Sequence, residues 1–184
     1  MVKKQPEPPI LVPVGDAATQ AAAGELIREY LGFIRDIALQ HYQLSFDIDA
    51  MVESDLHDPS KFYPPTGRFY LVRHGDRSIG VGCLKALGDP RVSELQRMYV
   101  QPSSRGVGAG RILLRRLLQD ATAMKFRSVR LESLRALEAA HALYRSVGFN
   151  EIDPYDENSM RDYQSSATIE RYRASAIFME LALA

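Results

Sequence analysis

The stretch ELQRMYVQPSSRGVGAG at residues 94–110, which runs on into RILLRRLL at residues 111–118, decides the fold of this chain. The residues up to Val100 are typical of a β-strand, Pro102 ends it, and a basic, glycine-rich loop over 105–110 leads into an amphipathic helix. Glycines let the backbone approach a ligand closely, and the first N–H groups of a helix have no partner within the helix. Because the helix dipole also favours an anion at this end, the stretch predicts a site for a phosphorylated ligand.

Further strands and helices are predicted on both sides of this stretch. Apolar residues at helical spacing and the N-cap residue Asp16 predict a long helix after the first strand. The full predicted order is strand 10–14, helices 17–42 and 45–56, strands 68–73, 78–87 and 93–100, a helix from the loop to about 125, strand 128–131, helix 137–146 closed by Gly148, strand 149–152, a polar loop over 153–173 and strand 176–183. This order describes an α+β, or mixed α/β, sheet domain.

Length and composition are those of an ordinary globular protein. The 184 residues, 46% of them hydrophobic and 25% charged, are enough for one domain with a full core. We expect a flexible, proline-rich tail over 1–9 and a single domain over 10–184. The sequence leaves open whether the chain acts alone or as a homodimer.

Charge and cysteine usage narrow the classes of partner. The 23 basic residues are balanced by 23 acidic ones, which argues against a nucleic-acid partner. The single cysteine, Cys83, forms no intramolecular disulfide, so a reducing cytoplasm is the expected location. No stretch approaches the roughly 20 apolar residues of a membrane span, and we expect no membrane partner. The four histidines show no ligand spacing, so no metal is expected.

The glycine-rich loop does not match two common phosphate-binding motifs. It lacks the Lys-Ser/Thr pair of a P-loop, and its spacing is not the GxGxxG of a dinucleotide fold. These differences weigh against a nucleotide- or flavin-binding protein, which stays a rival hypothesis. A bound chromophore, or stabilisation by ATP where coenzyme A has no effect, would favour that rival.

Two motifs resemble the GNAT superfamily of acetyl-CoA-dependent N-acetyltransferases. The first is Arg-x-x-Gly-x-Gly at Arg105, Gly108 and Gly110, and the second is AHALYRSVGF at residues 140–149. Both occur in the family's order and at its separation. The resemblance implies a central, mostly antiparallel, twisted sheet flanked by helices, in which one splayed strand pair holds the cosubstrate.

The resemblance also implies which residues hold acetyl-CoA. The backbone groups of Met98 and Val100 would pair with the pantetheine arm, and the Val100 N–H would stabilise the oxyanion. The loop would bind the diphosphate through backbone N–H groups, with Arg105 and Arg111 adding charge. The expected cosubstrate-binding residues are Met98, Val100, Arg105, Gly106, Val107, Gly108, Ala109, Gly110 and Arg111.

Acetyl transfer to an amine needs a proton acceptor, an oxyanion donor and a proton for the departing thiolate. Tyr144 resembles the family tyrosine that protonates the sulfur of coenzyme A; its alternative is an aromatic residue that packs a helix end. Glu94 matches in register the strand glutamate that serves as base in members acetylating protein lysines; its alternative is a salt-bridged strand glutamate. A relay through water from Glu132 or His141 is a further alternative for the base.

Two residues near these motifs have other interpretations. Cys83 is more typical of a small buried residue than of an acyl-carrying nucleophile, since the family transfers the acyl group directly. The family's second signature often carries an asparagine where this chain has Leu137. One contact to coenzyme A would then be absent or supplied by Ser133.

The acceptor is expected to be a small-molecule or peptide amine. Its site would be built by the N-terminal helices and by the loops over 57–67 and 153–173. The candidate aromatic residues are Tyr30, Phe33, Phe46, Tyr63, Tyr155 and Tyr163. The alternative from another class is a catalytically silent acyl-CoA-binding sensor or interaction module of the same fold.

Overall fold

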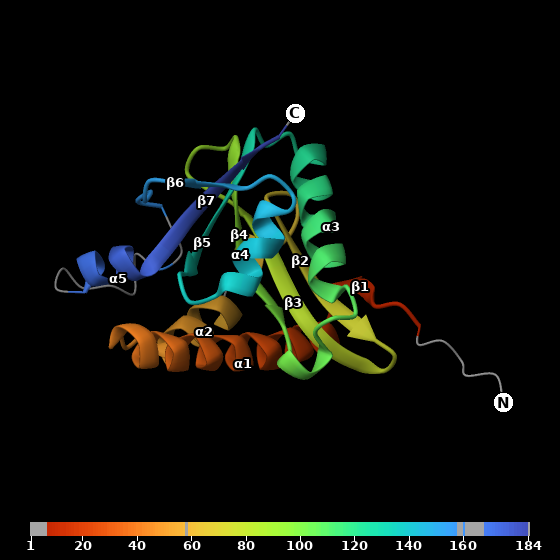
Figure 1. Cartoon of the computed structure of the whole chain (residues 1–184). Helices are drawn as coiled ribbons and strands as arrows, with labels where there is room; N and C mark the ends of the chain where they lie inside the picture. The colour runs from red at the N-terminus through yellow and green to blue at the C-terminus, as the bar shows by residue number, and fades with distance from the viewer. Residues whose placement is uncertain (1–6, 58, 158–159, 161–167, 184) are drawn as a thin grey trace.

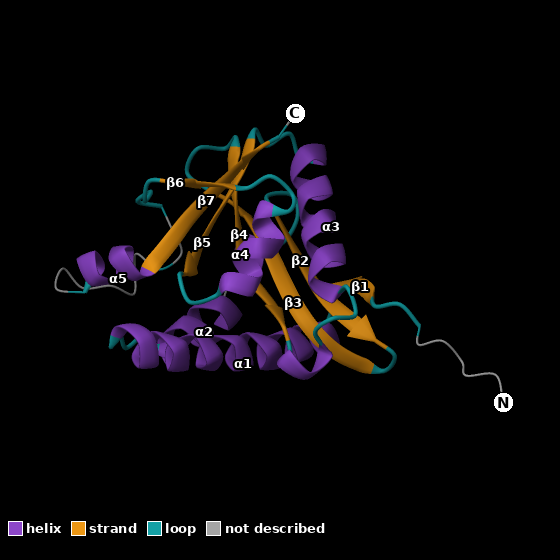
Figure 2. Ribbon diagram, viewed as in Figure 1, coloured by secondary structure: helices purple, strands orange, loops and turns teal. Residues whose placement is uncertain are grey.

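A seven-stranded sheet separates two layers of helices (Figures 1 and 2). The structure is a computed structural model that describes residues 7–57, 59–157, 160 and 168–183. The strands are β1 Ile10–Pro13, β2 Gly67–His74, β3 Arg77–Ala86, β4 Val92–Val100, β5 Ser128–Leu134, β6 Asn150–Ile152 and β7 Ala176–Ala182. The helices are α1 Ala17–Tyr42, α2 Ile48–His57, α3 Ala109–Ala123, α4 Glu138–Arg145 and α5 Ile169–Ser175, with 3-10 turns at Pro59–Phe62 and Pro102–Ser104.

The strand order in the sheet is β1-β2-β3-β4-β5-β7-β6. All neighbouring pairs are antiparallel except β4 and β5, which run parallel. The α+β prediction with a mostly antiparallel sheet is therefore confirmed. Most of the predicted tail over 1–9 lies outside the described residues.

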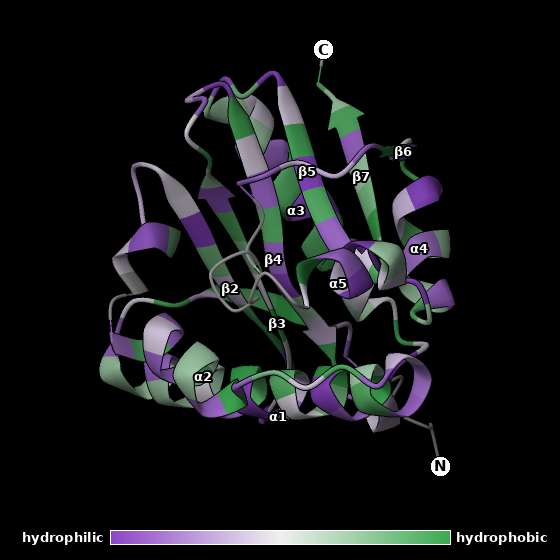
Figure 3. Cartoon of the chain, turned by 90° about the vertical axis from the view of Figure 1, so that its left-hand side faces the viewer, coloured by the Kyte–Doolittle hydropathy of each residue, from purple (hydrophilic) through white to green (hydrophobic). Residues whose placement is uncertain are grey.

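Each face of the sheet packs against its own helices. On one face, apolar residues of α1, α2 and α5 surround Phe69, Val81 and Tyr99 of the central strands. On the other face, α3 and α4 cover Val72 and Leu84. Figure 3 shows α1 and α2 side by side along the lower end of the sheet, where they contact one another. Two separate cores result, divided by the sheet.

The longest helix, α1, begins where the sequence predicts it. The Asp16 side chain accepts a hydrogen bond from the Thr19 backbone N–H at 2.8 Å, and Thr19 Oγ1 accepts one from the Asp16 N–H. This reciprocal capping satisfies donors that a helix start leaves unpaired. The helix then buries one stripe, including Ile27 and Leu31, against the sheet.

The parallel pair β4 and β5 is joined at one end only. Register runs from Val92 opposite Ser128 to Glu94 opposite Arg130, and within the described residues no pairing between these strands continues beyond that point. β5 goes on pairing with β7 along its whole length. The two strands therefore move apart toward α1, as Figure 2 shows, and leave a gap in the sheet.

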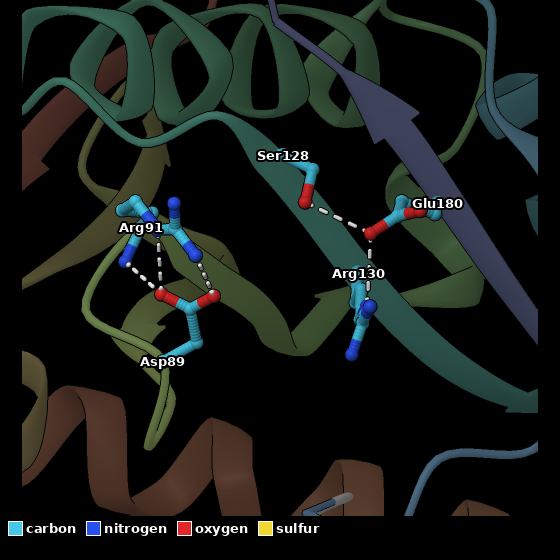
Figure 4. A network of polar contacts seen from close by, with 5 residues as sticks. All are labelled: Asp89, Arg91, Ser128, Arg130 and Glu180. Atoms are coloured by element: carbon cyan, nitrogen blue, oxygen red, sulfur yellow. Dashed lines mark hydrogen bonds and ion pairs between the residues drawn. The ribbon is translucent and has the colours of Figure 1, made fainter.

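Polar contacts hold the joined end of this gap (Figure 4). Glu180 of β7 accepts hydrogen bonds from Ser128 at 2.8 Å and from Arg130 at 2.9 Å, both on β5. In the turn that leads into β4, Asp89 pairs with Arg91 at 3.0 Å. These contacts fix the starting points of the two strands before they diverge.

A β-bulge at Arg97 changes the face of the sheet to which the later side chains of β4 point. Tyr99 lies opposite Val81 and Gln96 opposite Cys83, so Arg97 and Met98 together oppose one residue of β3. Arg97 has a φ of 55°, which bends the strand. Simple alternation along β4 would place Glu94, Gln96, Met98 and Val100 on one face. That expectation is wrong, because Met98 and Val100 pack on the α3 side while Glu94 and Gln96 face the other side.

Two further differences from the predicted elements concern the C-terminal part. β5 reaches Leu134 rather than 131, because β7 pairs with all of it. The predicted loop over 153–173 contains the start of α5, whose Tyr172 is 3% exposed and belongs to the core of the α1 side. Gly148 ends the α4 region with a φ of 104°, as predicted for a residue after a helix end. Among the described residues, no helix combines the length and hydrophobicity that crossing a bilayer needs.

Candidate active site

A groove of about 770 Å³ opens along β4 on its unpaired side. Its walls come from α1, the end of β4, the glycine-rich loop and α4. The lining residues are Tyr30, Phe33, Ile37, Met98, Tyr99, Val100, Arg105, Gly106, Gly108, Ala109, Gly110, Arg111, Ala136, Leu137, Glu138, Ala139, Ala140, Leu143 and Tyr144. Its size and elongated lining suit a long ligand that follows the strand into the start of α3.

The glycine-rich loop takes a conformation that only glycine adopts readily. Gly106 has a φ of 86° and Gly108, the N-cap of α3, a φ of 84°. A side chain at either position would strain the backbone. The loop thus delivers the N-terminus of α3, with its outward N–H groups and positive dipole end, to the floor of the groove.

The exposed edge of β4 offers backbone groups to the same groove. The Gln101 N–H donates to the Ile79 carbonyl at 2.9 Å, so in this antiparallel pair alternate residues, including Tyr99, direct their backbone groups toward β3. The backbone groups of Met98 and Val100 therefore point to the side where β5 has moved away. Their position fits a ligand chain that pairs with the strand edge.

Eight of the nine residues predicted to hold acetyl-CoA line the groove. The exception is Val107, which lies outside this lining and is 41% exposed. Arg105 is anchored, because its Nε donates to the Val100 carbonyl at 3.2 Å and its guanidinium lies 5.6 Å from the centre of the Phe33 ring. Arg111 lies in the first turn of α3.

A smaller, inner cavity of about 70 Å³ adjoins the groove at the gap between β4 and β5. The two hollows share five lining residues, namely Tyr30, Met98, Leu137, Ala140 and Tyr144. Polar groups reach the inner cavity from both diverging strands: Gln96 and Arg97 from β4, Glu132 and Ser133 from β5. Because the sheet is open here, the cavity is bounded by elements from both faces.

Tyr144 lies where the groove and the inner cavity meet. It projects from α4, is 7% exposed and packs against Phe149 with ring centres 5.8 Å apart. Burial raises the pKa of its hydroxyl well above 10, and the neighbouring Tyr30 adds to the rise. The side chain is therefore a protonated donor at neutral pH.

Glu94 lies behind the inner cavity and is absent from the lining of both hollows. Its carboxylate accepts a hydrogen bond from the Tyr155 hydroxyl at 2.6 Å and another from the Gln96 side-chain amide. Burial raises the pKa of Glu94, and these two hydrogen bonds oppose the rise. Gln96, which does line the cavity, stands between Glu94 and the cavity space.

Sequence reasoning missed a buried charge cluster beside the inner cavity. Asp55 of α2 pairs with Arg97 Nε at 2.5 Å and with Lys61 Nζ at 2.8 Å, and the side chains of Asp55 and Arg97 are 0% and 5% exposed. The pairing joins residues far apart in the sequence. The bulge that turns Arg97 toward α2 leaves no periodic signal, so the contact could not be read from spacing.

Other residues considered from the sequence take supporting positions. His141 is buried outside both hollows and lies 3.1 Å from Ser133 Oγ, and burial lowers the pKa of its imidazole. Leu137 lines both hollows at the position where the resemblance would place asparagine. Cys83 is fully buried, and burial raises the pKa of its thiol well above its usual range, which disfavours a nucleophilic thiolate.

The aromatic residues considered for the acceptor site separate into two groups. Tyr30 and Phe46 line the inner cavity and Phe33 lines the groove, whereas Tyr155 holds Glu94 and Tyr63 packs against Phe69. Tyr163 lies outside the described residues.

Comparisons with known proteins agree on one family. The family model for the acetyltransferase (GNAT) family matches residues 31–149. An uncharacterised N-acetyltransferase of Schizosaccharomyces pombe is 31% identical over 65% of this chain and 77% of its own length. An N-acetylaspartate synthetase of Rattus norvegicus is also 31% identical over 65% of this chain. The matched region covers 42% of that longer protein.

Solved structures show the same fold at low sequence identity. A GNAT-family acetyltransferase from Staphylococcus aureus superposes with a TM-score of 0.69 at 18% identity, covering 96% of this chain and 99% of its own. The PaiA N-acetyltransferase from Thermoplasma acidophilum, solved in complex with coenzyme A, superposes with a TM-score of 0.68 at 15% identity, covering 96% and 100%.

Proposed function

Because the chain belongs to the acetyltransferase (GNAT) family and is thus an acyltransferase, we propose that it moves an acetyl group from acetyl-CoA directly to a primary amine. The observation that carries the proposal is that the groove and the inner cavity adjoin, with Tyr144 lining both. One substrate would enter from each side, and the reacting atoms would meet at the gap in the sheet.

Acetyl-CoA would lie along the groove. Its diphosphate would accept hydrogen bonds from the backbone around Gly108, and the dipole of α3 would favour its negative charge. The pantetheine arm would pair with the free edge of β4 at Met98 and Val100. The acetyl carbonyl would then reach the Val100 N–H, which would stabilise the oxyanion that forms on attack.

Tyr144 would give its proton to the departing thiolate. Burial keeps its hydroxyl protonated, and the same burial raises the pKa of a thiol leaving group beside it. The amine attacks the carbonyl carbon, the carbon–sulfur bond breaks, and the proton from Tyr144 completes coenzyme A. Solvent returns a proton to the tyrosine after the products leave.

The proton of the attacking amine would go to Glu132. This carboxylate lines the inner cavity directly, whereas Glu94, the base expected from register, is separated from the cavity by Gln96. Glu94 would serve as a positioning residue, since its hydrogen bond fixes the side-chain amide of Gln96. The acceptor amine would approach between Gln96 and Glu132.

The acceptor is better matched by a small molecule than by a protein. The inner cavity measures about 70 Å³, which favours a compact amine over a polypeptide segment. The relatives named N-acetylaspartate synthetase are named for an acetylated small molecule, which is in keeping with this choice. We place the reaction in the cytoplasm, following the expectation from the single cysteine.

A thiol-release assay tests the proposal. Purified protein would be mixed with acetyl-CoA and a panel of primary amines, amino acids and short peptides, and free coenzyme A would be followed with a thiol reagent. We expect acceptor-dependent release, with an acetylated product detected by mass spectrometry. Tight binding of acetyl-CoA without release for any amine would instead support the catalytically silent sensor.

A further inference from the structure

We propose that the acceptor is a small amino acid whose carboxylate is bound by Arg97 inside the inner cavity. The inference rests on the acetyl transfer proposed above, and it names the chemical class of the second substrate. It also assigns a binding role to a residue that neither sequence motif contains.

Among the residues that the structure describes, Arg97 has hydrogen-bonding capacity left over within the cavity. It lines the inner cavity, and its side chain is 5% exposed. Nε donates to Asp55, and no hydrogen bond joins either terminal nitrogen to any residue that the structure describes. A guanidinium carries five N–H donors in a planar fork, and the outer ones match the two oxygens of a carboxylate.

The cluster of Asp55, Arg97 and Lys61 carries more positive than negative charge. Asp55 carries one negative charge and faces two cations, Arg97 and Lys61, so the cluster has a net charge of about +1 at neutral pH. Asp55 outweighs the effect of burial and raises the pKa of the Arg97 guanidinium, so Arg97 stays charged and can bind an anion through its outer N–H groups. The cluster therefore favours a negatively charged group on the acceptor.

Glu132 supplies a negative charge to the same space. It comes from β5, across the gap from Arg97 on β4, and lines the same cavity. Both charges act on the Tyr30 hydroxyl: burial raises its pKa, Arg97 lowers it and Glu132 raises it further. A cavity with a cation from one strand and a carboxylate from the other is complementary to a molecule with an amine and a carboxylate.

Cavity size restricts this molecule further. About 70 Å³ corresponds to roughly five water-sized groups, which suits a small amino acid. The N-terminus of a peptide or the side chain of a protein lysine has no free carboxylate next to its amine. Such acceptors would leave the outer N–H groups of Arg97 without a carboxylate, so the cavity would select against them.

The first test compares acceptors on the wild-type protein. Thiol release would be measured with a panel of L-amino acids, with their carboxamides and with the corresponding simple amines, such as L-alanine, L-alaninamide and ethylamine. We expect kcat/KM for the best amino acid to exceed that of its amide by roughly a hundredfold, because a site built for a charged group rejects an analogue that lacks it. Equal rates for acid and amide would overturn the inference and leave acetyl transfer standing.

The second test uses Arg97→Gln and Arg97→Lys. We expect Arg97→Gln to raise KM for the amino acid by about tenfold or more, while KM for acetyl-CoA and the rate with the carboxamide stay unchanged. Arg97→Lys would restore part of the affinity, because it keeps the charge without the fork. Arg116→Gln is the matched control, since Arg116 pairs with Asp120 away from both hollows, and it should leave all these values unchanged.

A binding experiment separates the two proposals. With unacetylated coenzyme A present, the amino acid should raise the melting temperature of the wild-type protein and not that of Arg97→Gln. If no amine is acetylated, the proposed function fails, and this measurement still decides whether Arg97 binds the carboxylate. If Arg97→Gln does not fold, the acid and amide series on the wild-type protein decides alone. An unchanged KM in a folded Arg97→Gln variant would overturn the role of Arg97.

Discussion

The proposed reaction depends most strongly on one group, the hydroxyl of Tyr144. Tyr144→Phe removes the hydroxyl at the junction of the two hollows and keeps the ring contact with Phe149. We expect kcat to fall by about 10²–10⁴-fold, the usual contribution of a general acid, with binding of coenzyme A unchanged by calorimetry. Because burial raises the pKa of Tyr144, turnover should show no loss from its ionisation up to about pH 10.

A matched control for this substitution is Tyr70→Phe. Tyr70 also has a largely buried ring and donates to Asp120 at 2.7 Å, but it lies outside both hollows. Removing the Tyr70 hydroxyl should leave kcat unchanged. Similar losses in both variants would indicate a general effect on the fold and would contradict an acid role for Tyr144.

Substitutions can likewise distinguish the roles of Glu132 and Glu94, the two carboxylates near the gap. We expect Glu132→Gln to lower kcat by about a hundredfold, because the proton acceptor is lost, with KM for acetyl-CoA unchanged. Glu94→Gln should act mainly on KM for the amine, since it disturbs the orientation of Gln96 and leaves the proton acceptor in place. Initial rates over both substrates at several pH values make the comparison.

The pH profiles decide between the carboxylates. Burial raises the pKa of Glu94, so if its ionisation were required, activity would fall at a higher pH on the acid side than for an ordinary glutamate. Glu94→Gln would remove that acid limb. Loss of the limb in Glu94→Gln, together with an unaffected Glu132→Gln, would return the base role to Glu94.

Among the elements, the loop between β4 and α3 depends most on its backbone conformation. Gly108 is the N-cap of α3 at a φ of 84°, where an added side chain strains the backbone although no atom lies within 4 Å. We expect Gly108→Ala to lower the free energy of unfolding by about 1 kcal/mol and to weaken binding of coenzyme A by about tenfold. Urea unfolding and titration calorimetry measure the two effects.

Gly32→Ala provides the comparison within a helix. Gly32 lies inside α1, and an added methyl group would likewise meet no atom within 4 Å. Alanine is the better helix former, so this variant should gain about 0.5–1 kcal/mol in unfolding free energy and bind coenzyme A normally. A stabilised Gly108→Ala would show that the loop relaxes freely and would contradict the strain argument.

The elements that the sequence predicts well are those with a local signal. α1 was expected over 17–42 and begins at the predicted cap Asp16, and the strand, glycine loop and helix around Gly108 occur as expected. α5 was missed, because its seven residues follow a long polar stretch and its stability comes from Tyr172 in the core. Short elements of this kind are fixed by tertiary packing rather than by periodicity.

The site was predictable only where the motifs reach. The glycine-rich loop and Tyr144 follow from two motifs, whereas Arg97 and Asp55 meet through a bulge that shifts the facing of β4 by one residue. A shift of one residue reverses the face of every later side chain on a strand, which is why Glu94 and Met98 do not share a face. No spacing rule applied to β4 alone could have placed Arg97 beside α2.

At the scale of the whole molecule, the Asp55 cluster links the acceptor side to stability. Asp55→Asn removes the anion between Arg97 and Lys61, and breaking such a buried pair costs about 3–5 kcal/mol. We expect a lower urea midpoint at neutral pH and a higher KM for the amine, because Arg97 loses its anchor. Asp36→Asn, which breaks an exposed pair with Arg35, should leave both values close to wild type.

The pH dependence of unfolding follows from the same carboxylate. Burial would raise the pKa of Asp55, but the charges and hydrogen bonds of Arg97 and Lys61 outweigh it, so the pKa lies below that of an ordinary aspartate. The unfolded chain therefore takes up this proton first, and the stabilisation present above about pH 4 is lost as the pH falls through the folded pKa. Unfolding free energies measured from pH 6 to pH 2 should fall less steeply in Asp55→Asn; an equal slope would contradict the pairing.

The gap between β4 and β5 also bears on how such an enzyme can change over time. The proposed coenzyme A groove is lined by the end of β4, the glycine-rich loop, α4 and part of α1, while only the inner cavity is lined by Gln96, Arg97 and the β5 residues Leu131–Leu134. Substitutions at the second set can alter which amine is acetylated while the first set stays intact. On this arrangement, substitutions in β5 or at the bulge would alter the acceptor while leaving unchanged the glycine-rich loop proposed to hold the donor.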